Sequence, residues 1–117
     1  MKIKALLFDL DGTLIDSIPF HKKSFQLIFK KFGKSLPESA IRNYIRWSTE
    51  EIYHHLKVKE KLGMNLESFL EMRREVYYSL IKNKKLLIKD RVSLIKKIRR
   101  KYKIALVSIS SRFTVDY

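Results

Sequence analysis

A short apolar run that leads into two aspartates and a glycine restricts the fold of this 117-residue chain more than any other feature. Residues 3–8, IKALLF, are nearly all apolar, which is typical of a strand buried in a parallel sheet. Gly12 allows the tight turn that follows. Asp9 and Asp11 therefore come at the carboxyl end of the strand, where open α/β sheets hold their ligands. The sequence predicts an α/β fold with a chemical site at this strand end.

The two aspartates also stand out by charge. Residues 1–16 hold two lysines and three aspartates, a net charge of −1, whereas the whole chain carries +14. Residues i and i+2 of a strand point the same way, so we expect the side chains of Asp9 and Asp11 to converge. Two converging carboxylates suit a hard divalent cation such as magnesium. A carboxylate can also attack phosphorus as a nucleophile, and a second one can carry the proton of the leaving group.

Residues 17–83 show four helix patterns and no strand pattern. The first helix ends at Gly33, which is typical of a C-cap, and the second opens at Pro37. The third begins with STEE at Ser48–Glu51, a capping box, and Asn65 caps the fourth. Four such helices in a row predict a small helical bundle. Its expected core consists of apolar residues at helical spacing: Phe25, Phe29, Ile41, Ile52, Phe69 and Val76.

The pattern changes after residue 83. DRVSLIKKIRRKY at 90–102 predicts an amphipathic helix with Asp90 as its cap, and KIALVSI at 103–109 predicts a second buried strand. The predicted order of strands and helices is that of an α/β unit whose first crossover contains a helical insertion. The predicted domains are therefore an α/β core of residues 1–16 and 84–117 and a helical insertion of residues 17–83.

FDLDGTLIDS at residues 8–17 resembles the first signature motif of the haloacid dehalogenase-like (HAD) superfamily, in its phosphatase and phosphoglucomutase-like members. That family places an α-helical cap between the first and second core strands, where this chain has its helical segment. It ends the second strand with Ser or Thr, and IALVSIS supplies Ser108 there. The resemblance covers nearly the whole chain. It implies a Rossmann-like HAD core, incomplete because only the first two parallel strands are present, with an inserted helical cap.

The resemblance implies a role for four residues. Asp9 would be the nucleophile and a magnesium ligand, and Asp11 the general acid/base, with its backbone carbonyl as a further magnesium ligand. Thr13 and Ser108 would bind the oxygens of the substrate phosphate. Dehalogenases of the superfamily lack a carboxylate at the position of Asp11, because a leaving halide needs no proton. The implied function is a Mg²⁺-dependent phosphatase of small phosphorylated metabolites that forms an aspartyl-phosphate.

A sugar-phosphate mutase is an alternative within the same family. His21 matches a position where mutase relatives carry a cap histidine, although a partly exposed helical histidine is the simpler interpretation. In YIRWSTEE, Thr49 stands where mutases have a phosphate-contacting arginine, which weakens this alternative. We expect Trp47, in the same stretch, to be a core residue of the cap rather than a substrate-facing aromatic.

The family's two later motifs, a lysine that steadies the aspartyl-phosphate and an acidic pair that completes the magnesium site, do not occur in this sequence. Two strands cannot bury both faces of a sheet on their own. We therefore expect a truncated chain that is inactive or incomplete by itself. Downstream sequence, a second subunit or self-association would complete the core. A non-catalytic remnant that keeps the cap is the main alternative to a phosphatase.

Composition narrows the remaining classes of function and the kinds of site that the chain could contain. Residues 82–103 hold eleven basic residues and one acid, so a polyanion-binding module is a further alternative. No aromatic-basic motif of a nucleic-acid module accompanies them, and solvated lysines explain the charge more simply, so we expect no nucleic-acid partner. The absence of cysteine excludes disulfides and zinc-thiolate sites. No apolar run approaches a signal peptide or the roughly 20 residues of a membrane span, and we expect a cytoplasmic protein.

Overall fold

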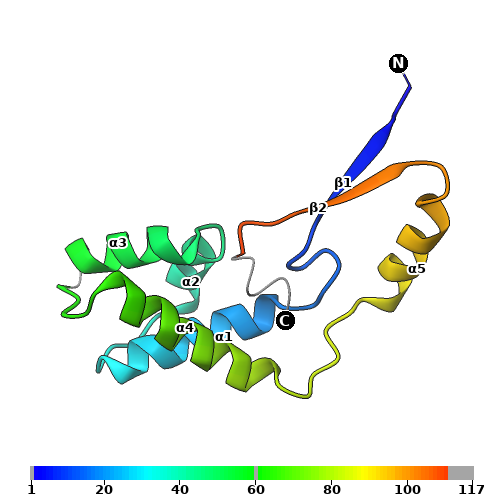
Figure 1. Ribbon diagram of the computed structural model, residues 1–117. Coiled ribbons are helices and arrows are strands. Elements are labelled where there is room, and N and C mark those ends of the chain that lie inside the picture. Colours follow the sequence, from blue (N-terminus) through cyan, green and yellow to red (C-terminus); the bar gives the residue numbers. More distant parts are fainter. Residues whose placement is uncertain (1, 60, 111–117) are drawn as a thin grey trace. The chain divides into compact units, whose positions relative to one another are not determined.

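The computed structural model describes residues 2–59 and 61–110 (Figure 1). The end of the predicted core, residues 111–117, therefore lies outside the described residues. The elements follow one another in the predicted order of one strand, five helices and one strand. Their bounds are β1 Ala5–Asp9, α1 Ile18–Lys31, α2 Glu38–Tyr44, α3 Thr49–Lys59, α4 Leu66–Ile81, α5 Lys89–Ile98 and β2 Lys103–Val107.

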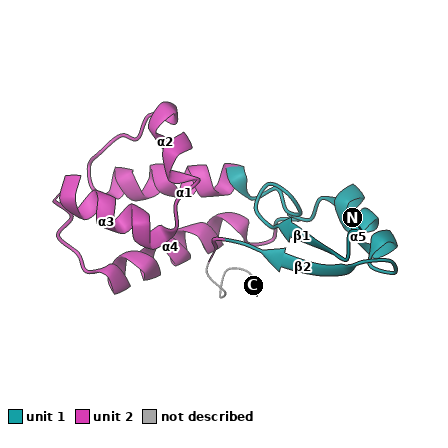
Figure 2. Cartoon of the chain, turned by 90° about the horizontal axis from the view of Figure 1, so that it is seen from above, with its two compact units in different colours: residues 1–18, 84–108 teal, residues 19–83, 109–117 magenta. Residues whose placement is uncertain are grey.

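The chain divides into two compact units, coloured separately in Figure 2. Residues 2–18 and 84–108 form the strand unit, which contains β1, α5 and β2. The described residues of 19–83, together with 109 and 110, form the helical unit, which contains most of α1 and all of α2, α3 and α4. Whether the units are domains with the predicted bounds stays a prediction.

In the strand unit, β1 and β2 pair in parallel along their whole lengths, from Ala5 opposite Lys103 to Asp9 opposite Val107. The expectation that these strands are buried is wrong for the part of the chain that the structure describes. Leu6 and Phe8 are half-buried, but Leu7 on the other face is 70% exposed. Two strands alone provide no third layer or neighbouring strand to cover these side chains.

The N-cap of helix α5 lies two residues earlier in the chain than predicted. Ile88 is the N-cap and Asp90 lies in the first turn, so the prediction that Asp90 caps this helix is wrong. The carboxylate still lies where it interacts favourably with the positive end of the helix dipole. None of the side chains of α5 is buried, although its apolar residues recur at helical spacing.

The helical unit contains all the buried apolar side chains in the described part of the chain. The six expected core residues are each buried, which confirms the predicted bundle core. Trp47 is the exception among the core predictions. It is 36% exposed and contacts the rings of Tyr44 and His55 edge-on, with centroid distances of 5.7 and 5.1 Å. Trp47 thus lies at the margin of the core.

The helix ends follow the predicted chemistry. Gly33 has a φ of 68° and the N–H of Lys34 donates to the carbonyl of Phe29 at 3.0 Å, which closes α1 in a Schellman motif. Ser48 and Glu51 exchange hydrogen bonds of 2.6 and 3.2 Å at the start of α3, and Asn65 accepts from the Ser68 N–H at 2.9 Å. The N–H of Ser48 lowers the pKa of the Glu51 carboxyl, because it stabilises the charged form.

None of the helices in the described residues combines the length and the apolar character that crossing a bilayer requires.

Candidate active site

Asp9 and the loop after it form a compact turn at the carboxyl end of β1. The Asp9 side chain is exposed, and its Oδ1 accepts a hydrogen bond from the Leu10 N–H at 2.8 Å. The Leu10 carbonyl in turn accepts from three amides of the loop, at 2.9–3.2 Å. These amides belong to Thr13, Leu14 and Ile15. These three hydrogen bonds to one carbonyl turn residues 13–15 back toward the end of β1, and Asp9 lies directly before this turn.

Gly12 is required at the tip of this turn. Its φ is 74°, a left-handed conformation that side chains with a Cβ rarely adopt. A Cβ at this position would also lie 2.9 Å from Cγ1 of Ile18. Glycine is therefore the residue that lets the chain place Asp11 and Thr13 on either side of so tight a bend.

Asp11 is held from the start of the first helix. Its Oδ1 accepts a hydrogen bond of 2.5 Å from the hydroxyl of Ser17, which is fully buried immediately before α1. A hydroxyl–carboxylate bond of this length is charge-assisted and fixes the orientation of both groups. Whereas Asp9 is exposed, Asp11 is thus half-buried and anchored.

Arg91 is a part of this site that sequence reasoning missed. Its Nη1 donates to the backbone carbonyls of Gly12 and Thr13, at 2.9 and 2.6 Å. The backbone adds two more bonds, from the Asp16 N–H to the Leu86 carbonyl and from the Ile88 N–H to the Leu14 carbonyl. No local pattern could reveal a contact between residues almost 80 positions apart, so the sequence alone carries no signal for it.

Ser108 lies at the same end of the sheet as Asp9, where the carboxyl ends of both strands are. The parallel register sets Asp9 opposite Val107, and Ser108 follows directly after β2. Thr13 lies on the loop after β1, where its N–H is bonded to Leu10 and its carbonyl to Arg91. The structure thus brings the four predicted site residues to one end of the strand unit, and their chemical roles stay predictions.

The donor set for a metal ion is small. Within residues 2–59 and 61–110, no three His, Asp or Glu side chains gather in a way that could hold one. Magnesium, however, usually keeps several waters and takes only one or two protein carboxylates together with phosphate oxygens. The oxygen donors of Asp9 and Asp11, two residues apart in the chain at one strand end, fit that smaller set.

The comparison with known families decides what kind of chain this is. Residues 6–117 match the family model of the haloacid dehalogenase-like hydrolases. The chain belongs to this family. It is similar to an uncharacterized protein of Haemophilus influenzae, with 30% identity over 114 residues that cover 97% of this chain and 56% of that protein. It is also similar to a phosphoglycolate phosphatase of Nitrosospira multiformis, with 38% identity over 53 residues, which cover 44% of this chain and 23% of that enzyme.

Solved structures support the fold. The crystal structure of CbbY from Rhodobacter sphaeroides in complex with phosphate superposes with a TM-score of 0.76 at 20% identity, covering 95% of this chain and 53% of that one. The predicted HAD fold class, two parallel core strands with an inserted helical cap, is thereby confirmed. The chain spans about half the length of these relatives.

Proposed function

We propose that this chain carries the nucleophile half of a magnesium-dependent phosphatase that acts on small phosphorylated metabolites. The observation that carries the proposal is the exposed carboxylate of Asp9 at the carboxyl end of β1, beside a loop that the Leu10 carbonyl and Arg91 hold in place. Membership of the haloacid dehalogenase-like hydrolases supports the same reaction class. The activity of the whole protein is part of this proposal.

The first step replaces the phosphate ester bond of the substrate by an acyl phosphate bond to the protein. A carboxylate oxygen of Asp9 attacks the phosphorus atom, the P–O bond to the substrate alcohol breaks, and an aspartyl-phosphate forms. Protonated Asp11 gives its proton to the leaving alkoxide, so that a neutral alcohol departs. The hydrogen bond between Asp11 and Ser17 orients the carboxyl group for this transfer.

The second step returns the protein to its starting state. The Asp11 carboxylate takes a proton from a water molecule as that water attacks the phosphorus of the aspartyl-phosphate. The P–O bond to Asp9 breaks, and inorganic phosphate leaves. The hydroxyls of Thr13 and Ser108 donate hydrogen bonds to the phosphoryl oxygens during both steps.

The Asp9 carboxylate and the backbone carbonyl of Asp11 would hold magnesium at this strand end. When bound, the ion neutralises negative charge on the phosphoryl group. This part of the proposal draws its support from the chemistry of the donor set, since carboxylate and carbonyl oxygens are the ligands that magnesium prefers.

Capture of the phosphoryl group tests the proposal without requiring full turnover. The protein is incubated with acetyl phosphate and magnesium, and its intact mass and peptide masses are then measured. We expect one phosphoryl group on the peptide that contains Asp9, and none in the Asp9→Asn variant. Asp16→Asn is the matched control, because it removes an exposed aspartate from the same loop end.

The proposal fails if the Asp9→Asn variant captures the phosphoryl group as well as the wild type, or if the wild type captures none with magnesium present. The latter outcome would favour the non-catalytic alternative. In a turnover assay of the whole protein, Asp9→Asn should lose at least about a hundredfold in rate, equivalent to roughly 2.7 kcal/mol of barrier.

A further inference from the structure

The strand unit has a concentration of exposed cations that the proposed reaction does not use. Residues 84–103 contain ten lysines and arginines against one acid, Asp90. Each of these cations is exposed. Arg91 is the member of the set that holds the site loop. The set consists of Lys84, Lys85, Lys89, Arg91, Lys96, Lys97, Arg99, Arg100, Lys101 and Lys103.

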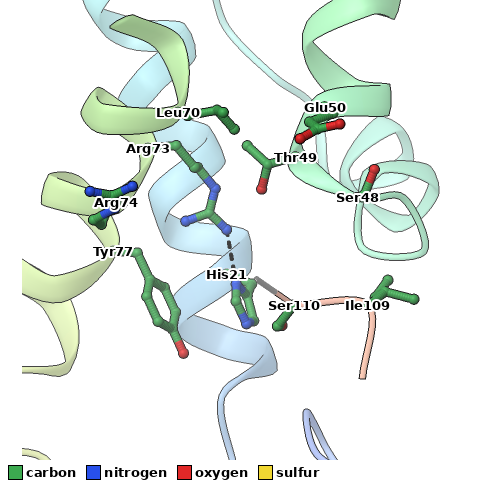
Figure 3. Close-up of a pocket in the computed structure, with 10 residues that line it drawn as sticks. All are labelled: His21, Ser48, Thr49, Glu50, Leu70, Arg73, Arg74, Tyr77, Ile109 and Ser110. Atoms are coloured by element: carbon green, nitrogen blue, oxygen red, sulfur yellow. Dashed lines mark hydrogen bonds between the residues drawn. The ribbon is translucent and has the colours of Figure 1, made fainter. Parts of the chain in front are cut away.

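Two cations of the helical unit show what a partner inside the chain looks like. Nζ of Lys22 lies 2.7 Å from Oε1 of Glu38. Nη2 of Arg73 lies 2.8 Å from Nδ1 of His21, and Figure 3 shows the two side chains pointing toward one another. In residues 84–103, by contrast, no cation forms an ion pair with a carboxylate of the described residues. Their charge is left for a partner outside the chain.

Helix α5 divides this charge from its apolar residues. One of its faces is half-buried and consists of apolar side chains at helical spacing: Val92, Ile95 and Ile98. Lys89 and Lys96 are seven residues apart and therefore share the opposite face, with Lys97 beside them. The outward face of α5 is thus a lysine surface.

Helix stability accounts for only part of this surface. Lys96 and Lys97 lie in the last turn of α5, where a cation interacts favourably with the negative end of the helix dipole. Lys89 is the first residue of the helix, where the same dipole disfavours a cation. Lys84 and Lys85 precede the helix altogether.

Exposed leucines lie among these cations. Leu87 is 64% exposed and Leu94 is 52% exposed. Leu94 comes three residues before Lys97, so the two side chains are neighbours on the helix surface. A bilayer with anionic headgroups accepts both kinds of side chain, because lysines bind the headgroups and a leucine enters the boundary with the acyl chains.

A nucleic acid fits this surface less well. It would bind the lysines through its phosphates but would leave the leucines in water. Proteins that bind single strands also stack bases on aromatic side chains. Tyr102 is the one aromatic residue of 84–103, and it is half-buried.

We propose that α5 and the residues that flank it dock on the surface of an anionic phospholipid bilayer. Lys89, Lys96 and Lys97 contact the headgroups, and Leu94 reaches the boundary with the acyl chains. The helix lies on the bilayer and does not cross it. This inference goes beyond the proposed phosphatase, and it holds whether or not Asp9 forms an aspartyl-phosphate.

Flotation of vesicles with the whole 117-residue chain tests the docking. Protein that has only associated with itself does not float, so the floating fraction measures bound chain. We expect binding to vesicles of phosphatidylcholine with about 30% phosphatidylserine, and at least about tenfold weaker binding to pure phosphatidylcholine. Raising the salt from about 0.1 to about 0.5 M should weaken the binding, because salt screens exposed charges.

Two double variants separate the surface of α5 from the net charge of the chain. Lys96→Gln with Lys97→Gln removes two exposed lysines from the last turn of α5. A lysine near an anionic surface contributes about fivefold to binding, so we expect this variant to bind at least about tenfold more weakly. Lys30→Gln with Lys31→Gln is the matched control, because it removes two exposed lysines from the last turn of α1. It should change the affinity less than about twofold.

Leu94→Gln tests the apolar part of the contact. The side chain is already half exposed, so the substitution should leave the circular dichroism of the chain unchanged. We expect it to weaken binding to the anionic vesicles about threefold or more, at high salt as at low salt. Binding of a DNA duplex, measured in parallel, should not respond to this variant.

Three results would each overturn the inference. One is equal binding to neutral and anionic vesicles, or binding to neither. Another is equal weakening by the two double lysine variants, which would show that only the net charge matters. The third is unchanged vesicle binding in Leu94→Gln. Tighter binding to the DNA duplex than to the anionic vesicles would show that the cations serve a nucleic acid instead.

Discussion

The helical unit and the strand unit of this chain pack in opposite ways. In the helical unit, Ile28, Ile52 and Phe69 are completely buried among the helices. In the strand unit, Leu7 is 70% exposed and Leu87 64% exposed, and α5 buries no side chain. Four helices satisfy their backbone hydrogen bonds internally and need only one another to cover their apolar faces. A strand needs neighbours at its edges and layers on its faces, and two strands supply neither in full.

This difference has a consequence for function. The predicted nucleophile and acid/base lie on the less packed unit, where hydrogen bonds hold the site loop. The bonds to the Leu10 carbonyl, from Ser17 to Asp11 and from Arg91 to the loop carbonyls hold that geometry. The buried Arg73 of α4 instead lies in the packed unit, where the rings of Phe25 and Tyr77 hold its guanidinium in place.

The largest effect should come from truncating one residue of the packed core. Phe69→Ala should destabilise the chain by about 3–5 kcal/mol, because it removes a fully buried ring and leaves a cavity. Leu7→Ala should change stability by no more than about 0.5 kcal/mol, because most of that side chain is already in water. Urea unfolding, monitored by circular dichroism, measures the free energy of unfolding of both variants. Equal losses in the two variants would contradict the contrast between the units.

The second prediction concerns association of the 117-residue chain. The uncovered faces of β1 and β2 should make it a dimer or a larger assembly at micromolar concentration, because exposed apolar strands pair with other chains. Sedimentation of the purified chain would measure its mass. Leu7→Glu should shift the population toward monomer.

Val58→Glu is the matched control for that experiment. Val58 is 84% exposed but lies alone on α3, in the unit that covers its own core. A monomeric wild type, or an equal effect of both substitutions, would show that the strand unit is not the associating surface.

The third prediction concerns the contact that holds the site loop. Arg91→Gln removes the cation that bonds the carbonyls of Gly12 and Thr13, and the loop should become easier to open by about 1 kcal/mol. Hydrogen exchange at the amides of Thr13 and Leu14 should then accelerate roughly fivefold. Arg99→Gln, an exposed arginine just beyond α5, is the control and should leave these amides unchanged. Unchanged exchange in Arg91→Gln would remove its positioning role.

The features that could be predicted from the sequence are those with local causes. The capping box at Ser48, the cap at Asn65 and the left-handed Gly33 each depend on a few adjacent residues, and all three are present. The loop geometry around Gly12 follows from the same kind of local rule. The HAD fold was predictable because the first motif and the position of the helical segment occur together.

The features that could not be predicted depend on distant parts of the chain. Arg91 meets the site loop across almost 80 residues, and Arg73 meets His21 across 52. Neither pair leaves a periodic pattern in the sequence. The sequence predicts Trp47 as a core residue of the cap, but its place at the margin depends on how Tyr44 and His55 pack beside it. Such contacts become visible only when the helices have been placed in space.

The smallest predicted effect tests whether the packed unit owes stability to its helix ends as well as to its core. The Ser48 N–H donates to Glu51 at 2.6 Å and holds the pKa of that carboxyl below its ordinary value of 4.5. A carboxyl whose pKa is lower in the folded state stabilises the fold when it is ionised. Its contribution is fully present above the ordinary pKa, and it is lost as the pH falls through the lower folded value.

Urea unfolding of the wild type and of Glu51→Gln, at pH 6 and again at pH 3, should reveal this contribution. We expect the wild type to be the more stable of the two at pH 6 and the difference to be smaller at pH 3, because a larger fraction of Glu51 is protonated there and resembles the amide. Glu50→Gln is the matched control, because it removes a carboxylate from the same turn and leaves the hydrogen bonds between Ser48 and Glu51 in place. Since Glu51 is exposed, the effect should be far smaller than that of Phe69→Ala. If the two glutamate variants lose stability with the same pH dependence, the dipole of α3 is the cause and the capping box adds nothing of its own.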